Sequence, residues 1–440
     1  MRILHVGNIA NNGYLAAKKE REQGYESYLI NVNAHHVMMM PEWEELNEDF
    51  NFNQFDVRKL KQFGANIPSW VLSGTWSEIY SVLFEINKSS KENNLKTDVK
   101  INLQNLLSFM IKYFRSWIPK KLRPFIAYNV LYRLRNFNEE KYITNIFASF
   151  DYIVLYGPFC SLSKFIKNGK YIAFEHGTLR NFVHTNYKLA KNTKSGFENA
   201  TVTLVSNQDC LNIAQTICKN EVIKSPHPIN DKNFYNERLL RNNFLIDNNS
   251  ESIEVLVPAR HTFSIATDIG KGNEAIYTAI KKLFNENCNI VFHLIKWGEN
   301  LPYAIKELAD IEKAGFVKWH NLMTRPKLRE FMIKSDAIID QLLIPAFGGI
   351  SIDAIGLGVP LLTNHESTID NEYFGSVAPI FSVNGADSIV ESLASLKRMT
   401  KNDQLDYFNN SCNWFDQNLT SDLSLAARLK AYHLVKSVKL

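Results

Sequence analysis

Two adjacent glycines and an aspartate stand close together in the run DQLLIPAFGGISIDAIGLGVP, which covers residues 340–360. Gly348 and Gly349 precede a short helical stretch that carries Asp353 about one turn further on. Glycines at the start of a helix let backbone amides approach a phosphate or a sugar, and the helix dipole favours an anion there. Asp353 can accept hydrogen bonds from both hydroxyls of a ribose. A glycine-rich turn with a structural aspartate would explain the glycines, but not their placement beside the acid.

Two cations occupy positions where ligands bind in α/β proteins. Arg260 ends the apolar run 253–260, and Lys271 lies between two glycines at the start of the helical pattern 272–287. Both side chains would then lie close together in the space beyond the end of a strand. A diphosphate leaving group carries negative charge, which two such cations would neutralise. The alternative is that both residues are solvated surface cations.

The first half of the chain carries two further candidate loops. Glu175 and His176 end an apolar run, and a histidine there can donate a hydrogen bond to a sugar hydroxyl or a phosphate oxygen. The loop from Gly7 to Gly13 joins the first apolar run to a helical pattern, so its amides can face an anion. This loop is not Gly-x-Gly-x-x-Gly, which disfavours a nicotinamide dinucleotide site. The alternatives are a histidine that caps its loop and a tight turn without a ligand.

The elements that must position these residues alternate between apolar runs and helical patterns. Apolar residues of 272–287 fall on one face at three- and four-residue steps, and Pro326 suits the first turn of a helix that ends near Ser335. Short apolar runs, which we expect to be buried strands, separate such helices. They are residues 3–7, 25–32, 152–156, 171–175, 201–206, 253–260, 289–297, 315–319, 337–343, 359–363 and 379–383. The alternation predicts an α/β protein with parallel sheets covered on both faces.

The length of 440 residues predicts two domains. We expect a first Rossmann-like domain over residues 1–225, with an insertion at about 35–145 where the periodicity blurs. A linker over residues 225–252 then leads to a second Rossmann-like domain over residues 253–415. A C-terminal helix at about 421–440 is expected to pack back on the first domain.

The composition excludes several classes of protein. An apolar fraction of 45% and a charged fraction of 22% are typical of a globular protein, and a net charge of only +5 argues against a dedicated nucleic-acid binder. Five widely spaced cysteines without a Cys-x-x-Cys pair favour free thiols in a reducing compartment over disulfides or zinc. No secretion leader and no apolar stretch of the ~20 residues that span a membrane are apparent. We therefore expect a cytoplasmic protein.

The run from Phe347 to Pro360 resembles the donor-binding signature of glycosyltransferase family 4, Glu-Gly-Phe-Gly-x-x-x-x-Glu-Ala-x-x-x-Gly-x-Pro. The two signature glutamates fall on Pro345 and Asp353. Arg260 and Lys271 look like the cation pair with which the family contacts the donor diphosphate, although their spacing is longer. The histidine that faces the donor sugar is matched by His176. The other positions that the resemblance assigns to the donor are Asn12, Gly13, Glu175, Lys296, Trp297, His320, Gly348, Gly349 and Ile350.

The resemblance implies a GT-B fold, in which two Rossmann-like domains face each other across a cleft and the second holds most of the donor. It also implies retaining transfer of a sugar from a nucleotide-diphosphate sugar to a hydroxyl of a glycan or lipid-linked acceptor, as in bacterial cell-surface polysaccharide or glycoconjugate assembly. No cofactor and no metal are required, and the lack of an Asp-x-Asp pair agrees with this. Two alternatives stay open. One is a nucleotide-sugar epimerase of the same fold, with Glu175 as its candidate acid or base, and the other is an inactive sugar-nucleotide-binding module.

Residues 101–138 contain seven basic side chains, many aromatic ones and no acid. Basic and aromatic residues together suit an anionic membrane surface, such as the inner face of the cytoplasmic membrane, where a lipid-linked acceptor would be presented. An aromatic stripe that faces the core, with a solvated basic face, explains the pattern equally well. We expect no nucleic-acid partner, because no known binding module is recognisable.

Overall fold

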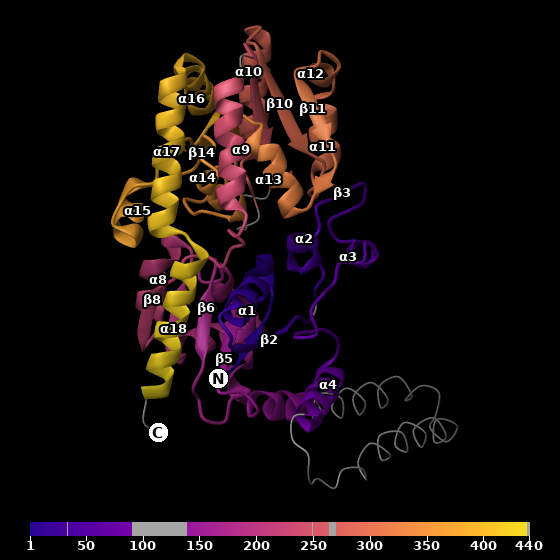
Figure 1. Ribbon diagram of the computed structural model, residues 1–440, viewed down its shortest axis with the longest axis vertical. Coiled ribbons are helices and arrows are strands. Elements are labelled where there is room, and N and C mark those ends of the chain that lie inside the picture. Colours follow the sequence, from indigo (N-terminus) through magenta and orange to yellow (C-terminus); the bar gives the residue numbers. More distant parts are fainter. Residues whose placement is uncertain (33, 90–138, 249, 264–269, 438–440) are drawn as a thin grey trace, which may run out of the picture.

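The computed structural model describes residues 1–32, 34–89, 139–248, 250–263 and 270–437 (Figure 1). Much of the expected insertion and all of the basic stretch 101–138 lie outside these residues. The membrane-facing surface therefore stays a prediction from the sequence.

Seven parallel strands form the first sheet, in the order β4-β2-β1-β5-β6-β7-β8. Their residues are mostly buried, because helices cover both faces and leave no polar side for alternation. The bounds are β1 Arg2–Val6, β2 Glu26–Ile30, β4 Val71–Leu72, β5 Tyr152–Tyr156, β6 Ile172–Glu175, β7 Val202–Val205 and β8 Glu221–Lys224.

Six parallel strands form the second sheet, in the order β11-β10-β9-β13-β14-β15. The bounds are β9 Ile253–Val257, β10 Ile290–Ile295, β11 Val317–His320, β13 Ala337–Ile339, β14 Leu361–Thr363 and β15 Phe381–Ser382. Two sheets of this kind confirm the predicted α/β fold class. In each sheet the strand order reverses beside its first strand, between β1 and β5 and between β9 and β13. Ligands of open α/β sheets bind beyond the strand ends at such points.

Helices pack on both sheets. In the first half they are α1 Asn12–Glu22, α2 Glu42–Glu45, α3 Val57–Lys61, α4 Trp76–Ser89, α7 Lys188–Glu198 and α8 Leu211–Ile217, with short 3-10 helices at Ile9–Asn11, Val37–Met39, Gly157–Phe165, Phe182–His184 and Gln208–Cys210. In the second half they are α9 Phe234–Asp247, α10 Asn273–Asn285, α11 Leu301–Glu307, α12 Ala309–Lys313, α13 Arg325–Ile333, α14 Gly349–Gly356, α15 Ser367–Phe374, α16 Ala386–Arg398, α17 Lys401–Asn418 and α18 Ser421–Ser437. Helix α10 buries the apolar face that its periodicity indicates.

The stretch 225–252 is not the plain linker that the sequence predicts, because α9 occupies half of it. This helix buries Arg241, whose guanidinium Nη1 donates to the carbonyls of Ile333 and Ser335 at 2.9 and 2.7 Å. The hydrogen bonds stabilise the end of α13, so α9 is a layer of the second half of the molecule.

Helix α18 runs down the outside of the first sheet, next to α1 and β8 (Figure 1). Its inner face meets Glu20 of α1, which is fully buried. The carboxylate of Glu20 accepts hydrogen bonds from Arg428 Nε and Tyr432 Oη, both at 2.8 Å, and its other oxygen lies 2.8 Å from His5 Nε2. A buried ionic network therefore fixes the C-terminal helix to the first sheet.

The segment from His36 to Gln54, which we call the bridging segment, contacts both halves of the molecule. On one side, the side chains of Asn8, Asn11 and Asn31 donate to the carbonyls of Met39 and Met40 at 2.7–2.9 Å. On the other, β3 (Asp49–Phe50) pairs antiparallel with β12 (Leu322–Met323). The segment therefore spans one end of the space between the two sheets.

Candidate functional site

A cavity of about 960 Å³ lies between the two halves of the molecule, at the strand ends where each sheet reverses its order. It is large enough for a ligand of the size of a nucleotide sugar. Of the residues that the sequence singles out, it is lined by Asn12, His176, Arg260, Lys271, Trp297, Phe347, Gly348, Gly349 and Ile350. It is not lined by Gly13, Glu175, Lys296, His320 or Asp353.

Arg260 and Lys271 both face the cavity, as expected for residues after β9 and before α10. Burial lowers the pKa of the Lys271 ammonium to about 8, although Asp340 nearby opposes the shift. Burial also lowers the pKa of Arg260 from its usual value. Neither shift is cancelled by the acids nearby, Glu299 and Asp340, so a bound dianion would stabilise the charged forms of both side chains.

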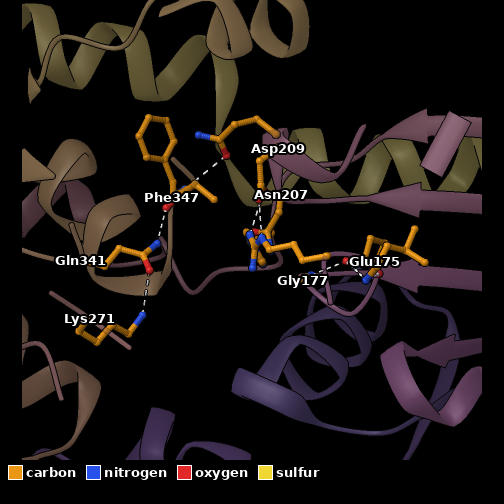
Figure 2. A network of polar contacts seen from close by, with 12 residues as sticks. Glu175, Gly177, Asn207, Asp209, Lys271, Gln341 and Phe347 are labelled. Carbon is orange, nitrogen blue, oxygen red and sulfur yellow. Dashed lines mark hydrogen bonds and ion pairs between the residues drawn. The ribbon is translucent and has the colours of Figure 1, made fainter. Parts of the chain in front are cut away.

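A chain of hydrogen bonds connects Lys271 to the loop before α14, as Figure 2 shows. Lys271 Nζ donates to Gln341 Oε1 at 3.1 Å, and Gln341 Nε2 donates to the carbonyl of Ala346 at 2.7 Å. The next amide, of Phe347, donates to Gln208 Oε1 from the first half at 3.3 Å. These hydrogen bonds fix the position of the Lys271 ammonium group relative to the loop that carries the glycine pair. Gln208, from the first half of the molecule, helps to hold this loop.

The fold does not require glycine at positions 348 and 349. A Cβ added to Gly348 would meet nothing closer than Asp340 Oδ2 at 3.9 Å, and one added to Gly349 would lie 3.6 Å from the Arg325 guanidinium, an ordinary contact. The backbone of Gly348 has φ −86° and ψ 179°, which any residue adopts. Because packing leaves room for a side chain here, the close approach of a ligand to the first amides of α14 is the remaining physical reason for glycine.

Gly13 is different, because a Cβ there would lie 2.3 Å from the carbonyl oxygen of Gly7. Its glycine is required by the contact between α1 and the loop that follows β1. Asn12 is the residue of this loop whose polar side chain lines the cavity, beside Ile9 and Ala10. Its Oδ1 lies 3.2 Å from His227 Nδ1, and its buried Nδ2 has no hydrogen-bond partner among the residues described.

The glycine pair gives a prediction that separates binding from stability. Gly348→Ala and Gly349→Ala should each weaken binding of a nucleotide-diphosphate sugar by about tenfold, or 1.4 kcal/mol, because a methyl group would hold the phosphate away from the amides. Thermal unfolding of the ligand-free protein should change by less than about 0.5 kcal/mol. Gly13→Ala is the control and should lower the unfolding temperature. Unchanged affinity in both variants would remove the phosphate from the start of α14.

Asp353 lies behind the glycine pair and is 1% exposed. Its two carboxylate oxygens accept from Nε and Nη2 of Arg325 at 2.7 and 2.9 Å. The same guanidinium lies 3.6 Å from the carboxylate of Glu44, on the bridging segment. The ribose-binding role that the resemblance gives Asp353 would thus require Arg325 to move away, because the pair is bidentate and buried.

Tryptophan rings build one side of the cavity. Trp297 is 8% exposed, and its indole N–H donates to the carbonyl of Pro258 at 2.9 Å. Its ring stacks with that of Trp43 from the bridging segment at a centroid distance of 6.5 Å, and the Arg260 guanidinium lies 6.0 Å from its centroid. Lys296 and His320 are neighbours through a backbone hydrogen bond, but neither side chain reaches the cavity.

The loop after β6 presents His176 to the cavity and keeps Glu175 behind it. The fully buried Glu175 carboxylate accepts from the backbone amides of Gly177 and Leu179, which fixes the turn. Burial raises the pKa of Glu175 to about 7 and lowers that of His176 to about 4. His176 is therefore neutral at pH 7. Its buried Nε2 has no hydrogen-bond partner among the residues described, so it is available to a ligand.

Several cavity residues escape the sequence analysis. His36, Trp43 and Glu44 belong to the region where periodicity blurs, and Arg325 reads only as the residue before a helix proline. The bridging segment reaches the second half through contacts between residues nearly 300 apart, such as the hydrogen bond from Asn47 to Glu330. No local sequence pattern predicts such contacts. The four residues Glu42–Glu45 contain a single apolar side chain, Trp43, so no amphipathic period indicates the helix that they form.

The described ranges contain no cluster of three or more His, Cys, Asp or Glu that could hold a metal ion. Within the same ranges, every helix is too short or too polar to cross a membrane. The five cysteines are unpaired, in agreement with their spacing in the sequence.

No protein-family model and no curated protein sequence matches the chain. Solved structures do match over the whole length. Sucrose-phosphate synthase from Thermosynechococcus elongatus has a TM-score of 0.57 at 10% identity, and Anabaena Alr3699/HepE in complex with UDP and glucose has 0.57 at 12%, each with 100% of both chains covered. UDP-GlcNAc 2-epimerase from Neisseria meningitidis bound to UDP-GlcNAc has 0.51 at 14%, covering 99% of this chain and 100% of the other. The chain therefore has the GT-B fold, which these glycosyltransferases and epimerases share.

Proposed function

We propose that the protein is a glycosyltransferase, related to family 4, which takes a sugar from a nucleotide-diphosphate sugar bound in the cavity. The observation that carries the proposal is the juxtaposition of Lys271, Arg260 and the Gly348-Gly349 amides around one space. Two cations and a glycine-opened helix are what a diphosphate requires. The GT-B fold supports the proposal, since two structures that share it hold UDP with a sugar or UDP-GlcNAc.

In the proposed reaction, the acceptor hydroxyl oxygen attacks the anomeric carbon on the face that the leaving diphosphate vacates. The bond between that carbon and the diphosphate oxygen breaks, and the hydroxyl proton passes to this oxygen. The configuration is then retained without a protein nucleophile. Arg260 and Lys271 stabilise the charge that develops on the diphosphate, and neutral His176 donates to a sugar hydroxyl or holds the sugar ring in place. The proposed reaction needs neither a cofactor nor a metal ion.

The acceptor belongs to the wall formed by the first half of the molecule. We propose a hydroxyl of a glycan or a lipid-linked acceptor, in bacterial polysaccharide or glycoconjugate assembly in the cytoplasm or at the inner face of its membrane. The basic and aromatic composition of residues 101–138 supports the lipid-linked form.

An epimerase is the second candidate, because it shares the fold and because carboxylates do face the cavity. They are Glu44, Glu299 and Asp340, whereas Glu175 is sealed behind its loop. An inactive binding module is the third candidate, since Pro345 stands at the position of the first signature glutamate.

One assay separates the three candidates. The protein is incubated with UDP-, GDP-, ADP- and CMP-linked sugars, and the products are separated chromatographically. A transferase slowly releases free nucleotide from one donor by hydrolysis, and an epimerase converts one nucleotide sugar into another. Binding without either product would leave the inactive module and contradict the proposal.

A further inference from the structure

Glu44 is a buried carboxylate of the cavity wall with an unused oxygen. The residue is 3% exposed and lines the cavity, and it comes from the half of the molecule opposite to Lys271 and the glycine pair. Its Oε1 lies 3.6 Å from Arg325 Nη1. Its Oε2 has no hydrogen-bond partner of normal geometry within the part of the chain that is described. A buried polar atom that lacks a partner destabilises the protein, so a ligand that supplies a hydrogen bond to it is favoured.

The position of Glu44 is fixed by contacts on both of its sides. Met39 and Met40 are tied to the loop after β1, and β3 is paired with β12. The neighbouring Trp43 stacks on Trp297. Glu44 therefore lies between the tryptophan side of the cavity and the Arg325-Asp353 pair beneath the glycines.

The charges around Glu44 select the kind of group it can bind. Arg325 faces two carboxylates, Glu44 and Asp353, so the ionised cluster carries one excess negative charge. Burial raises the pKa of Glu44, while Arg325 lowers it. A phosphate is repelled here and belongs with Lys271 and Arg260 across the cavity. Neutral hydroxyl groups can donate to a carboxylate oxygen without adding a like charge, and two adjacent hydroxyls can satisfy it fully.

In a nucleoside diphosphate, the ribose connects the base to the phosphates. If the diphosphate lies at Lys271 and the base at the tryptophans, the ribose diol next to the base lies on the tryptophan side of the cavity, where Glu44 adjoins Trp43. Asp353 lies close by, but Arg325 already pairs with both of its oxygens. Glu299 and Asp340 also line the cavity, but they interact electrostatically with Arg260 and so belong to the diphosphate end. We propose that Glu44 binds the ribose hydroxyls of the donor, and that Asp353 acts indirectly by holding Arg325 beside Glu44. This inference rests on the proposed function and adds that the first half of the molecule recognises the donor nucleotide.

Deoxynucleotides test this assignment directly. We would measure binding of UDP, ADP and GDP, and of their 2′-deoxy and 3′-deoxy forms, by titration calorimetry with the full-length protein. The wild type should bind the ribonucleotide of its preferred base at least about tenfold more tightly than a deoxy form, since a hydrogen bond to a charged group contributes roughly 1.5–3 kcal/mol. In Glu44→Ala this preference should fall to less than about threefold, and in Glu44→Gln it should fall to an intermediate value.

Glu42→Gln is the matched control. Glu42 is on the same helix, is 5% exposed and also has a carboxylate oxygen without a partner among the described residues, but it does not line the cavity. Its variant should keep the full preference for ribonucleotides. Asp353→Asn should weaken all nucleotides and preserve a measurable preference, because Glu44 remains.

Three outcomes would overturn the inference. Glu44→Ala and Glu44→Gln could weaken ribose and deoxyribose forms by the same factor, which would indicate a merely structural role. Asp353→Asn could abolish the preference while both Glu44 variants keep it, which would return the ribose to Asp353. If none of the nucleotides binds the wild type, the proposed function fails and the assignment of Glu44 fails with it. The first two outcomes leave the proposed function intact.

Discussion

Removal of the Lys271 ammonium should lower turnover by on the order of a hundredfold, which is the usual effect of losing one preorganised group that stabilises developing charge. Lys271→Ala and Arg260→Ala are each expected to show this loss, because both cations face the proposed diphosphate position. Donor hydrolysis at saturating nucleotide sugar measures it. Lys281→Ala is the control, since Lys281 is on α10, the helix that follows Lys271, but pairs with Glu307 at the surface. Turnover near that of the wild type in both single variants would contradict the diphosphate assignment.

The lowered pKa of Lys271 predicts a pH dependence for the same site. Burial brings this pKa to about 8, so the side chain is charged below pH 8 and neutral above it. The affinity for the nucleoside diphosphate of the preferred base should therefore be constant near pH 6.5–7 and should fall as the pH rises through about 8. Lys271→Met should bind it weakly and without this step. An identical step in the variant would show that another group titrates.

Loss of the Arg428 guanidinium should destabilise the protein by about 3–5 kcal/mol, which is the cost of leaving a buried ion without its partner. Arg428 is 1% exposed and donates to Glu20, which is fully buried. In a domain of roughly 200 residues, each kcal/mol shifts the unfolding temperature by about 2–4 °C, so Arg428→Met should unfold about 6–20 °C lower. Differential scanning calorimetry measures the shift.

Lys430→Met is the control for this change on the same helix. Lys430 and Glu221 form an exposed pair at 3.9 Å, with side chains 62% and 54% exposed. Such a pair contributes at most about 1 kcal/mol. If the two variants are equally stable, Arg428 does not hold α18 on the first sheet.

Glu20 also gives a pH dependence of stability with a defined sign. Burial alone would raise its pKa, but His5 and Arg428 outweigh burial and lower it from 4.5 to about 2. The charged carboxylate therefore contributes stability above about pH 4.5, and this contribution is lost as the pH falls from 4.5 towards 2. In Arg428→Met the pKa of Glu20 is lowered less, so the loss between pH 4.5 and 2 should be smaller and should end at a higher pH.

The fold class follows from the sequence because buried parallel strands leave a local pattern. Residues 152–156 and 253–257 are short apolar runs, and the structure contains them as strands. Helix α9 leaves a weaker pattern, since it is amphipathic only slightly and its buried Arg241 is a charged residue. From the sequence alone, Arg241 would be expected at the surface, because its acceptors, the carbonyls of Ile333 and Ser335, are brought to it only by the tertiary structure.

The candidate site follows from the sequence only where its residues end strands or begin helices. Lys271, Arg260 and the glycine pair are of this kind, and they line the cavity. The bridging segment has no such local pattern, because β3 has only two residues and pairs with a strand more than 270 residues away. The role of Asp353 depends on Arg325, a pairing that only the tertiary structure reveals.

Binding of a nucleotide sugar in the cavity is the central claim, and a thermal-shift titration tests it most directly. The wild type and Lys271→Ala would be titrated with UDP-, GDP-, ADP- and CMP-linked sugars. At a hundred times its dissociation constant, the correct donor should stabilise the wild type by about 2.7 kcal/mol. The same concentration should stabilise Lys271→Ala much less. If no donor at millimolar concentration shifts the wild type, or if Lys271→Ala is stabilised equally, the cavity is not a site for nucleotide sugars of this kind.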